Sequence, residues 1–475
     1  MQNPAQIQAA IEVCQLIFLQ RTVPADKVIK VYFRDRRYIG AKDKRAISMR
    51  VYMLLRRMSR YERVTGENAR LLMILLLRDE EGLSLSDLHF VFAGGMYSPP
   101  ELTEEEINYI KTPLTFTKAE ELALPEALHE YFVESMSTEM CKELAEAYLT
   151  EGSFDLRVNA IKSTREAAMA VLMGEGFDVS PTPHSPFGIR FKGRQSLEGH
   201  HLFKDGIVDV QDEGSQLIAL SCEASAKMAV LDYCAGAGGK TLALAAAMQN
   251  KGQLFACDIH EWRLNRARDR LRRASIHNVR FNEANDSKFL KRHQNFFDRV
   301  LVDAPCSGTG TWRRNPDMKF KTTQRDINEL QVLQRSILSK VAPLVKSGGW
   351  LVYATCSVFK RENQDQIAWF LENNPDFRLI TDERPEDEVD PAAENDVLPV
   401  EAIEIITDSA NNERSENTII VAKLTKPKKV QKSVFYANLS NTLPKVDGAN
   451  NALGLQLLPN LHGTDGFFMS ILVKI

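Results

Sequence analysis

The sequence predicts an α/β protein in which a doubly wound parallel sheet is preceded by a small α/β unit and an N-terminal helical region. In the second half of the chain, apolar runs of strand length alternate with helical segments. Over the first 140 residues, by contrast, apolar side chains recur at helical spacing. The length of 475 residues exceeds what one core usually organises, which indicates two or three domains.

The composition, with 44% hydrophobic and 26% charged residues, is that of an ordinary globular protein. The longest apolar run, Leu71 to Leu77, is too short to cross a bilayer, and the first residues lack a signal-peptide pattern. The seven scattered cysteines form no C-x-x-C pair, which favours free thiols in a reducing compartment. We therefore expect a cytoplasmic monomer with no membrane contact and no bound metal.

Periodicity and turn residues predict the elements of the first half of the chain. We expect helices at 9–18, 44–58, 67–77, 114–150, 164–174 and 215–220, and strands at 154–162, 185–191 and within 206–216. The strands and the helix at 164–174 form the small α/β unit.

Basic and aromatic side chains are mixed in the helical region: Arg34, Arg36, Arg37, Lys42, Lys44, Arg45, Arg50, Arg56, Arg57, Arg60 and Arg63 with Tyr32, Phe33, Tyr38, Tyr52 and Tyr61. Such a mixture suits phosphate contacts and base stacking, and predicts salt-sensitive RNA binding. The alternative is a solvated helix face whose aromatic side chains point into the core. The formal net charge of −3 does not decide between them, because net charge averages over domains.

The doubly wound sheet is expected to contain strands at 228–234, 253–258, 279–283, 299–304 and 350–355, with helices at 242–248, 262–273, 326–345 and 362–372. Gly236, Gly238 and Gly239 follow the first strand and precede a helix, so a ligand could approach the backbone closely there. Asp258 closes the next strand, where a carboxylate can bind both hydroxyls of a ribose. These features predict a nucleoside cofactor, either a dinucleotide or S-adenosylmethionine.

Two cysteines follow two strands that are expected to be neighbours. Asp303 lies at the end of the fourth strand, Cys306 follows it, and Cys356 ends the fifth. Ligands of such sheets bind beyond the carboxyl ends of the strands, although a single cysteine in this position is more often a small buried hydrophobe. Two thiols beside a nucleoside site suit cytosine, because C5 becomes nucleophilic only after a thiolate adds to C6.

These motifs together resemble a known family. CAGAGGKT, Asp258, DAPCSGTG followed by RRNPDMK, YATCS and the terminal GTDGFF resemble the bacterial Rsm-type (Fmu/Sun-like) RNA (cytosine-5)-methyltransferases, relatives of the NOP/NSUN enzymes. The stretch AKDKRAISMRVYMLLRR is similar, more loosely, to a NusB-like RNA-binding domain. The resemblance implies a NusB-like domain at 1–140, a small α/β linker or RNA-binding domain at 141–212, and a Rossmann-like class I methyltransferase domain at 213–475 with an insertion at 380–457.

By the same resemblance, the cofactor is S-adenosylmethionine. Asp258 would bind its ribose and Asp286 would lie beside its adenine, although the sequence around Asp286 departs from the usual glycine-acid pair. Ala237 stands where relatives usually carry proline. The other residues expected at the cofactor are Cys234, Ala235, Gly236, Gly238, Gly239, Lys240 and Asp303.

The resemblance also implies the catalytic roles. Cys356 would attack C6 of a flipped cytosine, and Cys306 would assist the later elimination at C5. Asp303 would hydrogen-bond the N3/N4 edge of the base, and Lys240 would lie near both the acid and the thiolate. Ribosomal RNA of the small subunit is the favoured substrate, with tRNA second.

Three other classes of protein explain less of the sequence. A DNA cytosine methyltransferase would continue its Pro-Cys motif as PCQ, whereas this chain reads PCSGTG and has a Thr-Cys motif as well. A non-catalytic RNA-binding protein leaves the thiols and the glycine loop without a role. A nicotinamide dehydrogenase has no use for the two cysteines.

Overall fold

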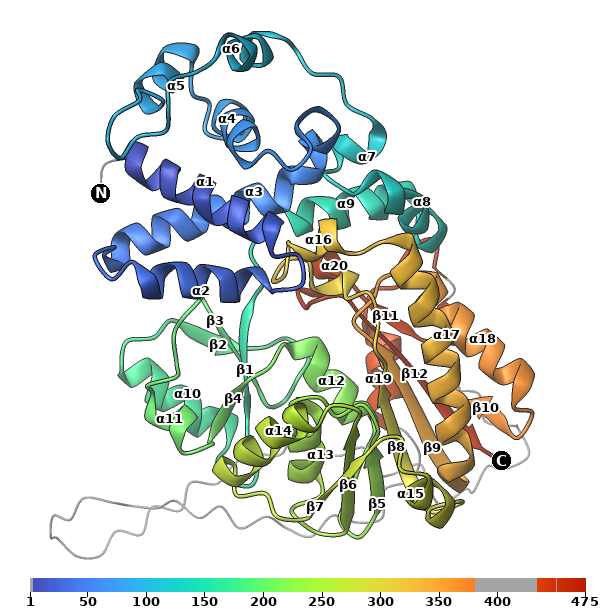
Figure 1. The fold of residues 1–475 in the computed structure, drawn as a ribbon. Helices are drawn as coiled ribbons and strands as arrows, with labels where there is room; N and C mark the ends of the chain where they lie inside the picture. Colours follow the sequence, from blue (N-terminus) through green and yellow to red (C-terminus); the bar gives the residue numbers. More distant parts are fainter. Residues whose placement is uncertain (1–2, 381–433, 450) are drawn as a thin grey trace, which may run out of the picture.

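The computed structural model describes residues 3–380, 434–449 and 451–475. A helical domain, blue to cyan in Figure 1, lies at one end of the molecule, a small sheet lies next to it, and a large sheet with its helices forms the rest. The predicted fold class is confirmed. The insertion predicted at 380–457 falls largely outside the described residues, and only its last part is described.

The helical domain is built around a core shared by α1, α3 and α4. Every residue from Leu71 to Leu77 is buried there, which explains the longest apolar run in the sequence. The third helix begins after Gly40 and ends at Gly66, whose φ of +54° suits glycine. The helices are α1 (Asn3–Leu19), α2 (Ala25–Asp35), α3 (Ala41–Thr65), α4 (Ala69–Asp79), α5 (Leu85–Val91), α6 (Glu104–Lys111), α7 (Lys118–Glu121), α8 (Glu126–Ser135) and α9 (Thr138–Tyr148).

The small domain is an antiparallel sheet in the order β2-β3-β1-β4. Its elements are β1 (Phe154–Val158), α10 (Arg165–Gly174), β2 (Val179–Pro181), β3 (Gly188–Phe191), α11 (His201–Lys204) and β4 (Val208–Val210). The strand expected within 206–216 is therefore short. It stops because Asp212 caps the next helix, α12 (Glu213–Ser221), by accepting a hydrogen bond from the N–H of Gly214.

The large sheet has the order β10-β12-β9-β8-β5-β6-β7, and β11 pairs with β12. Strands β5 to β9 are parallel, whereas β10, β11 and β12 run antiparallel to their neighbours. The strands are β5 (Ala229–Asp232), β6 (Gln253–Asp258), β7 (Val279–Glu283), β8 (Phe297–Asp303), β9 (Val345–Thr355), β10 (Phe377–Leu379), β11 (Leu455–Leu457) and β12 (Phe467–Lys474). The helices are α13 (Gly239–Ala247), α14 (Glu261–Arg273), α15 (Ser287–Arg292), α16 (Met318–Lys321), α17 (Gln324–Val341), α18 (Gln364–Asn373), α19 (Val434–Thr442) and α20 (Pro459–His462).

Apolar side chains cover both faces of this sheet. Along β8, Leu301 belongs to the core formed with α12, α13, α14 and α19, whereas Val300 and Val302 belong to the core formed with α15, α17 and α18. This alternation explains why the strand reads as a continuous apolar run. The strand order reverses between β5 and β8, so the ends of β5, β6, β8 and β9 surround the position where such sheets bind ligands.

Several predicted boundaries were wrong. The helix expected over 114–150 is divided into α7, α8 and α9, and the strand expected over 154–162 ends at Val158. The first strand of the large sheet ends at Asp232 instead of residue 234, because the chain turns there into the glycine loop. The helix expected to reach Val345 ends at Val341, since Pro343 has no N–H to continue it, and Val345 begins β9. Across the described residues we find no helix with the length and apolar character that a membrane span requires.

Candidate active site

The loop between β5 and α13 is shaped by glycines. Gly236 and Gly238 have φ values of +55° and +79°, which most residues avoid. A Cβ on Gly238 would lie 2.8 Å from the Cβ of Ala267 in α14, whereas no atom lies within 4 Å of a Cβ placed on Gly236. The loop therefore packs closely against α14 on one side and is open at Gly236, before the first turn of α13.

Asp258 lies at the end of β6 and faces this loop. Its side chain is only 5% exposed. Oδ2 accepts a hydrogen bond from the N–H of Gly236 (2.9 Å), and Oδ1 accepts one from the N–H of His260 (2.8 Å). The structure thus brings Asp258, the residue predicted to bind the ribose, into direct contact with the predicted glycine loop.

Among the expected cofactor residues, Asp286 and Ala235 have evident structural roles, and Cys234 is a buried thiol. Asp286 caps α15 by accepting a hydrogen bond from the N–H of Lys288 (2.9 Å) and is half-buried. Burial raises the pKa of the Cys234 thiol well above its usual value, so this thiol stays neutral. Ala235 donates its N–H to the carbonyl of Cys257 (2.9 Å), which anchors the start of the loop.

Lys240 and Asp303 form an ion pair at the centre of the site. The Nζ of Lys240 lies 2.7 Å from Oδ2 of Asp303, and Lys240 is 9% exposed while Asp303 is half-buried. Burial alone would lower the pKa of Lys240, but the nearby Asp303, Cys356 and Asp232 together raise it. Lys240 therefore stays charged beside the acid, and the second thiol lies near enough to contribute to this rise.

Cys306 and Cys356 lie against each other. Their Sγ atoms are 3.3 Å apart, and the N–H of Cys356 donates to the Sγ of Cys306 at 3.3 Å. The hydrogen bond with Cys356, followed by burial, raises the pKa of Cys306 well above its usual value. The pair thus combines a neutral thiol at Cys306 with a second sulfur that lies near the cation of Lys240.

A buried carboxylate that the sequence did not reveal joins the two cysteine loops. Glu362 accepts hydrogen bonds from the N–H of Ser307 (2.9 Å) and from the hydroxyl of Ser357 (2.6 Å). These serines directly follow Cys306 and Cys356. Glu362 is completely buried, so its contacts fix the relative position of the two thiols.

The C-terminal GTDGFF segment closes the site from another side. A Cβ on Gly310 would lie 1.9 Å from the carbonyl oxygen of Gly466, so only glycine fits there. Arg314 forms ion pairs with both Asp212 and Asp465. The ring of Phe467 lies 5.8 Å from Nζ of Lys240. Three parts of the chain therefore meet beside the Lys240–Asp303 ion pair. They are the segment after Cys306, the small domain and the C-terminal strand.

The RRNPDMK stretch connects this site to the helical domain. Lys319 is fully buried and donates to the carbonyls of Arg56 (3.0 Å) and Ala123 (3.1 Å). Asp317 accepts a hydrogen bond from the N–H of Ala25 at the start of α2 (3.1 Å). The motif therefore joins the helical domain to the domain of the large sheet.

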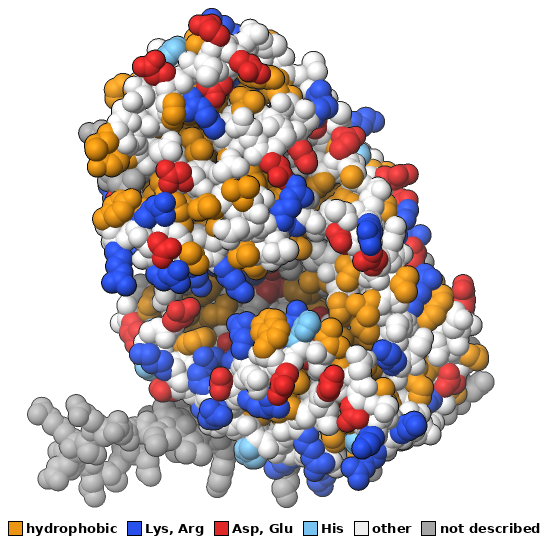
Figure 2. Space-filling view, in the orientation of Figure 1, with side chains coloured by type: hydrophobic (Ala, Val, Ile, Leu, Met, Phe, Trp, Pro, Cys, Tyr) orange, Lys and Arg blue, Asp and Glu red, His pale blue; other side chains and the backbone are white. Residues whose placement is uncertain are grey.

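The basic side chains of the helical domain differ in pairing and exposure. Arg50, Arg57 and Arg63 are engaged in ion pairs with Glu81, Glu80 and Glu120. Tyr32 and Tyr61 are buried in the core, as the alternative interpretation expects. The half-buried members are Arg36, Lys44, Arg56 and Arg60. The exposed members are Arg34, which pairs with Asp35, and Arg37, Lys42, Arg45 and Tyr38. Figure 2 shows a hollow between the helical domain and the rest of the molecule. Lys and Arg side chains gather along the edge of the helical domain that faces this hollow.

Glu175, His200 and His201 form a cluster away from this site whose atoms could approach one cation. However, Nδ1 of His200 accepts a hydrogen bond from the N–H of Leu202 (3.2 Å). The proton of the neutral ring then lies on Nε2, which is 2.7 Å from Glu175. The contact is explained as a histidine-carboxylate hydrogen bond.

The sheet order, the glycine loop and the acid at the end of β6 define a Rossmann-like methyltransferase fold. The model of the family "16S rRNA methyltransferase RsmB/F" matches residues 218–473, and that of the RsmF/B-like ferredoxin-like domain matches residues 124–198. The chain belongs to the RsmB/F family of methyltransferases.

Curated relatives and a solved structure agree with this assignment. The probable ribosomal RNA small subunit methyltransferase B of Bacillus subtilis is 36% identical over 263 residues, 54% of this chain and 58% of the relative. Ribosomal RNA small subunit methyltransferase B of Proteus mirabilis is 38% identical over 223 residues, 46% of this chain and 52% of the relative. These matches span just over half the length of the relatives. A methyltransferase homolog protein from Pyrococcus horikoshii is 26% identical, with a TM-score of 0.54, covering 75% of this chain and 98% of that chain.

S-adenosylmethionine is the cofactor of this methyltransferase. The residues fit such a ligand. The loop is open at Gly236, the N-terminus of α13 follows it, and the buried Asp258 lies at the adjacent strand end.

Proposed function

We propose that the protein methylates C5 of cytosine in structured RNA through a covalent adduct between Cys356 and C6. Ribosomal RNA of the small subunit is the favoured substrate, because the curated relatives carry that name. The observation that carries the proposal is the pair of sulfurs 3.3 Å apart beside the Lys240–Asp303 ion pair. Two adjacent thiols next to a nucleoside site suit a reaction that needs one nucleophile and one group acting later.

In the proposed reaction, the thiolate of Cys356 adds to C6 of a cytosine that has left its stack. Asp303 accepts a hydrogen bond from the amino group at N4 of the base. When its carboxyl carries a proton it donates that proton to N3, which stabilises the electron density that reaches C5. Lys240 keeps Asp303 in place through their ion pair. S-adenosylmethionine, when bound, supplies an electrophilic methyl group.

The adduct must then be resolved. The C5 proton passes to the sulfur of Cys306 while the thiol of Cys306 gives its own proton to the departing sulfur of Cys356, 3.3 Å away. The C6–S bond breaks in the same step and the aromatic ring is restored. Glu362 holds both cysteine loops, so the two sulfurs stay in register throughout the cycle.

The rest of the chain suits an RNA substrate in the cytoplasm. The helical domain, residues 1–140, would act as a NusB-like RNA-binding domain, and the small domain, residues 141–212, as a linker to the methyltransferase domain. Asp258 would bind the ribose, residues 234–240 the methionine part, and Asp286, the N-cap of α15, the adenine.

Methyl transfer from labelled S-adenosylmethionine to RNA tests the proposal. Small-subunit ribosomal RNA and total tRNA are incubated separately with the full chain, digested to nucleosides and analysed by mass spectrometry. We expect 5-methylcytidine from the ribosomal RNA, and bisulfite sequencing then locates it. A methyl group on another base or atom would overturn the cytosine-C5 assignment. Titration that detects binding of NAD but not of S-adenosylmethionine would overturn the reaction itself.

A further inference from the structure

Arg270 in α14 joins the glycine loop to the small domain. Its Nη1 donates to the carbonyl of Ala237 (2.8 Å). Its Nε and Nη2 donate to Oδ2 of Asp209 in β4 (3.1 and 2.8 Å). One guanidinium thus connects an element of the small domain with the loop proposed to hold the cofactor.

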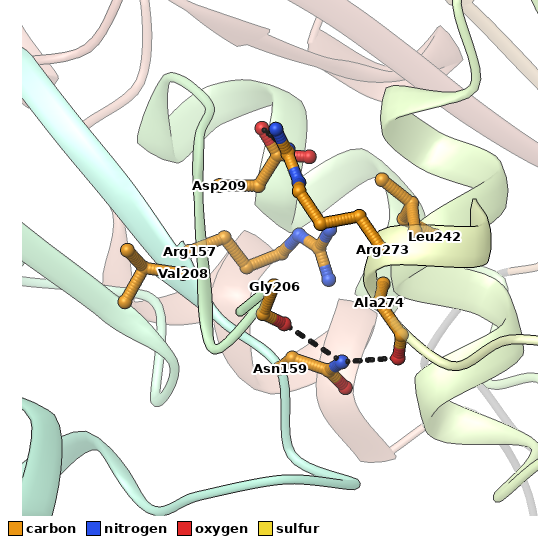
Figure 3. Close-up of a pocket in the computed structure, with 8 residues that line it drawn as sticks. All are labelled: Arg157, Asn159, Gly206, Val208, Asp209, Leu242, Arg273 and Ala274. Carbon is orange, nitrogen blue, oxygen red and sulfur yellow. Dashed lines mark hydrogen bonds and ion pairs between the residues drawn. The ribbon is translucent and has the colours of Figure 1, made fainter. Parts of the chain in front are cut away.

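The carboxylate that anchors Arg270 is itself firmly held. Asp209 is 8% exposed and forms a second ion pair with Arg273 at 3.4 Å. Figure 3 shows Asp209 and Arg273 beside a cavity of about 10 Å³ between the small domain and α14. Across this cavity, Asn159 donates to the carbonyls of Gly206 (3.2 Å) and Ala274 (2.9 Å). The small domain and α14 therefore form one rigid support for Arg270.

The loop needs such a support because its own backbone is permissive. Gly236 and Gly238 flank Ala237, and both adopt left-handed conformations. Ala237 itself places no covalent restriction on the chain, and the hydrogen bond from Arg270 to its carbonyl holds the loop in this shape.

The loop is then held from two sides. The carboxylate of Asp258 accepts the N–H of Gly236, and the guanidinium of Arg270 donates to the carbonyl of Ala237. These two bonds constrain consecutive residues of the segment that faces the cofactor. A loop ordered before binding loses less conformational entropy when the ligand arrives.

We propose that Arg270 is a positioning residue. Anchored to Asp209 of the small domain, it holds the cofactor loop at Ala237 and so acts as a clamp that raises the affinity for S-adenosylmethionine. This inference rests on the cofactor site proposed above. Arg270 does not touch the reacting atoms, so its effect falls on cofactor binding more than on the chemical step.

Three variants of the full chain test the clamp by isothermal titration with S-adenosylmethionine. Arg270→Met should bind about tenfold more weakly, the loss typical of a charged hydrogen bond. Asp209→Asn, which removes the charged anchor, should weaken binding in the same direction, and the two changes combined should cost less than their sum. In assays of methyl transfer, KM for the cofactor should rise more than kcat falls.

Arg273→Met is the matched control. Arg273 pairs with the same carboxylate, but its guanidinium lies over the ring of Phe203 (3.9 Å) instead of reaching the loop. This variant should lose clearly less affinity for the cofactor than Arg270→Met, because the hydrogen bond to the loop remains. If Arg273→Met loses as much affinity as Arg270→Met, docking of the small domain explains the effect and the clamp is wrong. Wild-type affinity in Arg270→Met would also overturn it.

Hydrogen exchange in the absence of cofactor separates failure of the clamp from failure of the proposed function. Peptides covering residues 234–240 should exchange faster in Arg270→Met than in the wild type and Arg273→Met. Unchanged exchange in Arg270→Met contradicts the clamp, whatever ligand the loop binds. Faster exchange in a protein that fails to bind S-adenosylmethionine supports the clamp while contradicting the cofactor site.

Discussion

The carboxylate of Asp258 accepts a hydrogen bond from the backbone N–H of Gly236 across 2.9 Å, and it is almost completely buried. The sequence predicted an acid at a strand end that binds the ribose of the cofactor. In the structure the same side chain also braces the glycine loop. A change at Asp258 therefore alters both the proposed ribose contact and the shape of the loop.

Asp258→Ala should weaken binding of S-adenosylmethionine by about 1.5 to 3 kcal/mol, because a charge-assisted hydrogen bond is lost. Isothermal titration measures this directly. The control is Glu261→Ala, which removes an exposed acid nearby in α14. Equal dissociation constants for Asp258→Ala and the wild type would count against the ribose assignment.

The exposed part of the basic cluster should carry the RNA contacts. Replacement of Arg37, Lys42 and Arg45 by alanine should weaken RNA binding and reduce the slope of log K against log salt by about 2 to 3, since three phosphate contacts disappear. Filter binding at several salt concentrations provides the measurement. Alanine at the exposed Lys111 and Lys118 is the control for net charge. A triple variant that retains the wild-type slope would mean that these cations face solvent only.

Asp232, beneath the glycine loop, should make stability depend on pH. Burial raises its pKa to about 7, with Asp303 and Asp258 adding to the rise and the Thr241 hydrogen bond opposing it. Between pH 4 and 7 the carboxyl is protonated in the folded protein but ionised in the unfolded chain, so stability falls as pH rises through this window.

Asp232→Asn removes this dependence. In urea unfolding, the free energy of unfolding of the variant relative to the wild type should rise from pH 5 to pH 8 by an amount on the order of a few kcal/mol. Glu283→Gln, a change at an exposed strand end, serves as the control. If the free energies of unfolding of Asp232→Asn and the wild type differ by the same amount across this range, Asp232 is ionised in the folded protein.

The sequence predicted the parts of the site that depend on local patterns. The alternation of strands and helices, the left-handed glycines and the cysteines at adjacent strand ends all follow from short stretches of chain. Asp286 was assigned to the adenine, although an aspartate just before a short helix is also a capping signal, and it caps α15.

Contacts between distant residues were not predictable in this way. Glu362 reaches Ser307 across 55 positions, and Arg270 reaches Ala237 across 33. No periodicity or spacing marks either side chain. Likewise, the basic cluster looked uniform in sequence, yet Arg50 and Arg57 pair with acids of the same domain. Only the packing of α3 against its neighbours separates them from the exposed cations.

The roles of the two thiols follow from their order of action. Without Cys356 no adduct forms, so C5 never becomes nucleophilic and turnover should cease in Cys356→Ala. Without Cys306 the attack and the methyl transfer still occur, but release is impaired. Cys306→Ala should therefore remain joined to its RNA.

The most direct measurement is a denaturing gel of end-labelled RNA incubated with S-adenosylmethionine and each variant. We predict a slowly migrating, protease-sensitive band for Cys306→Ala and no such band for Cys356→Ala or for the double variant. A band formed by Cys356→Ala but not by Cys306→Ala would contradict the account, because the Pro-Cys thiol would then be the nucleophile.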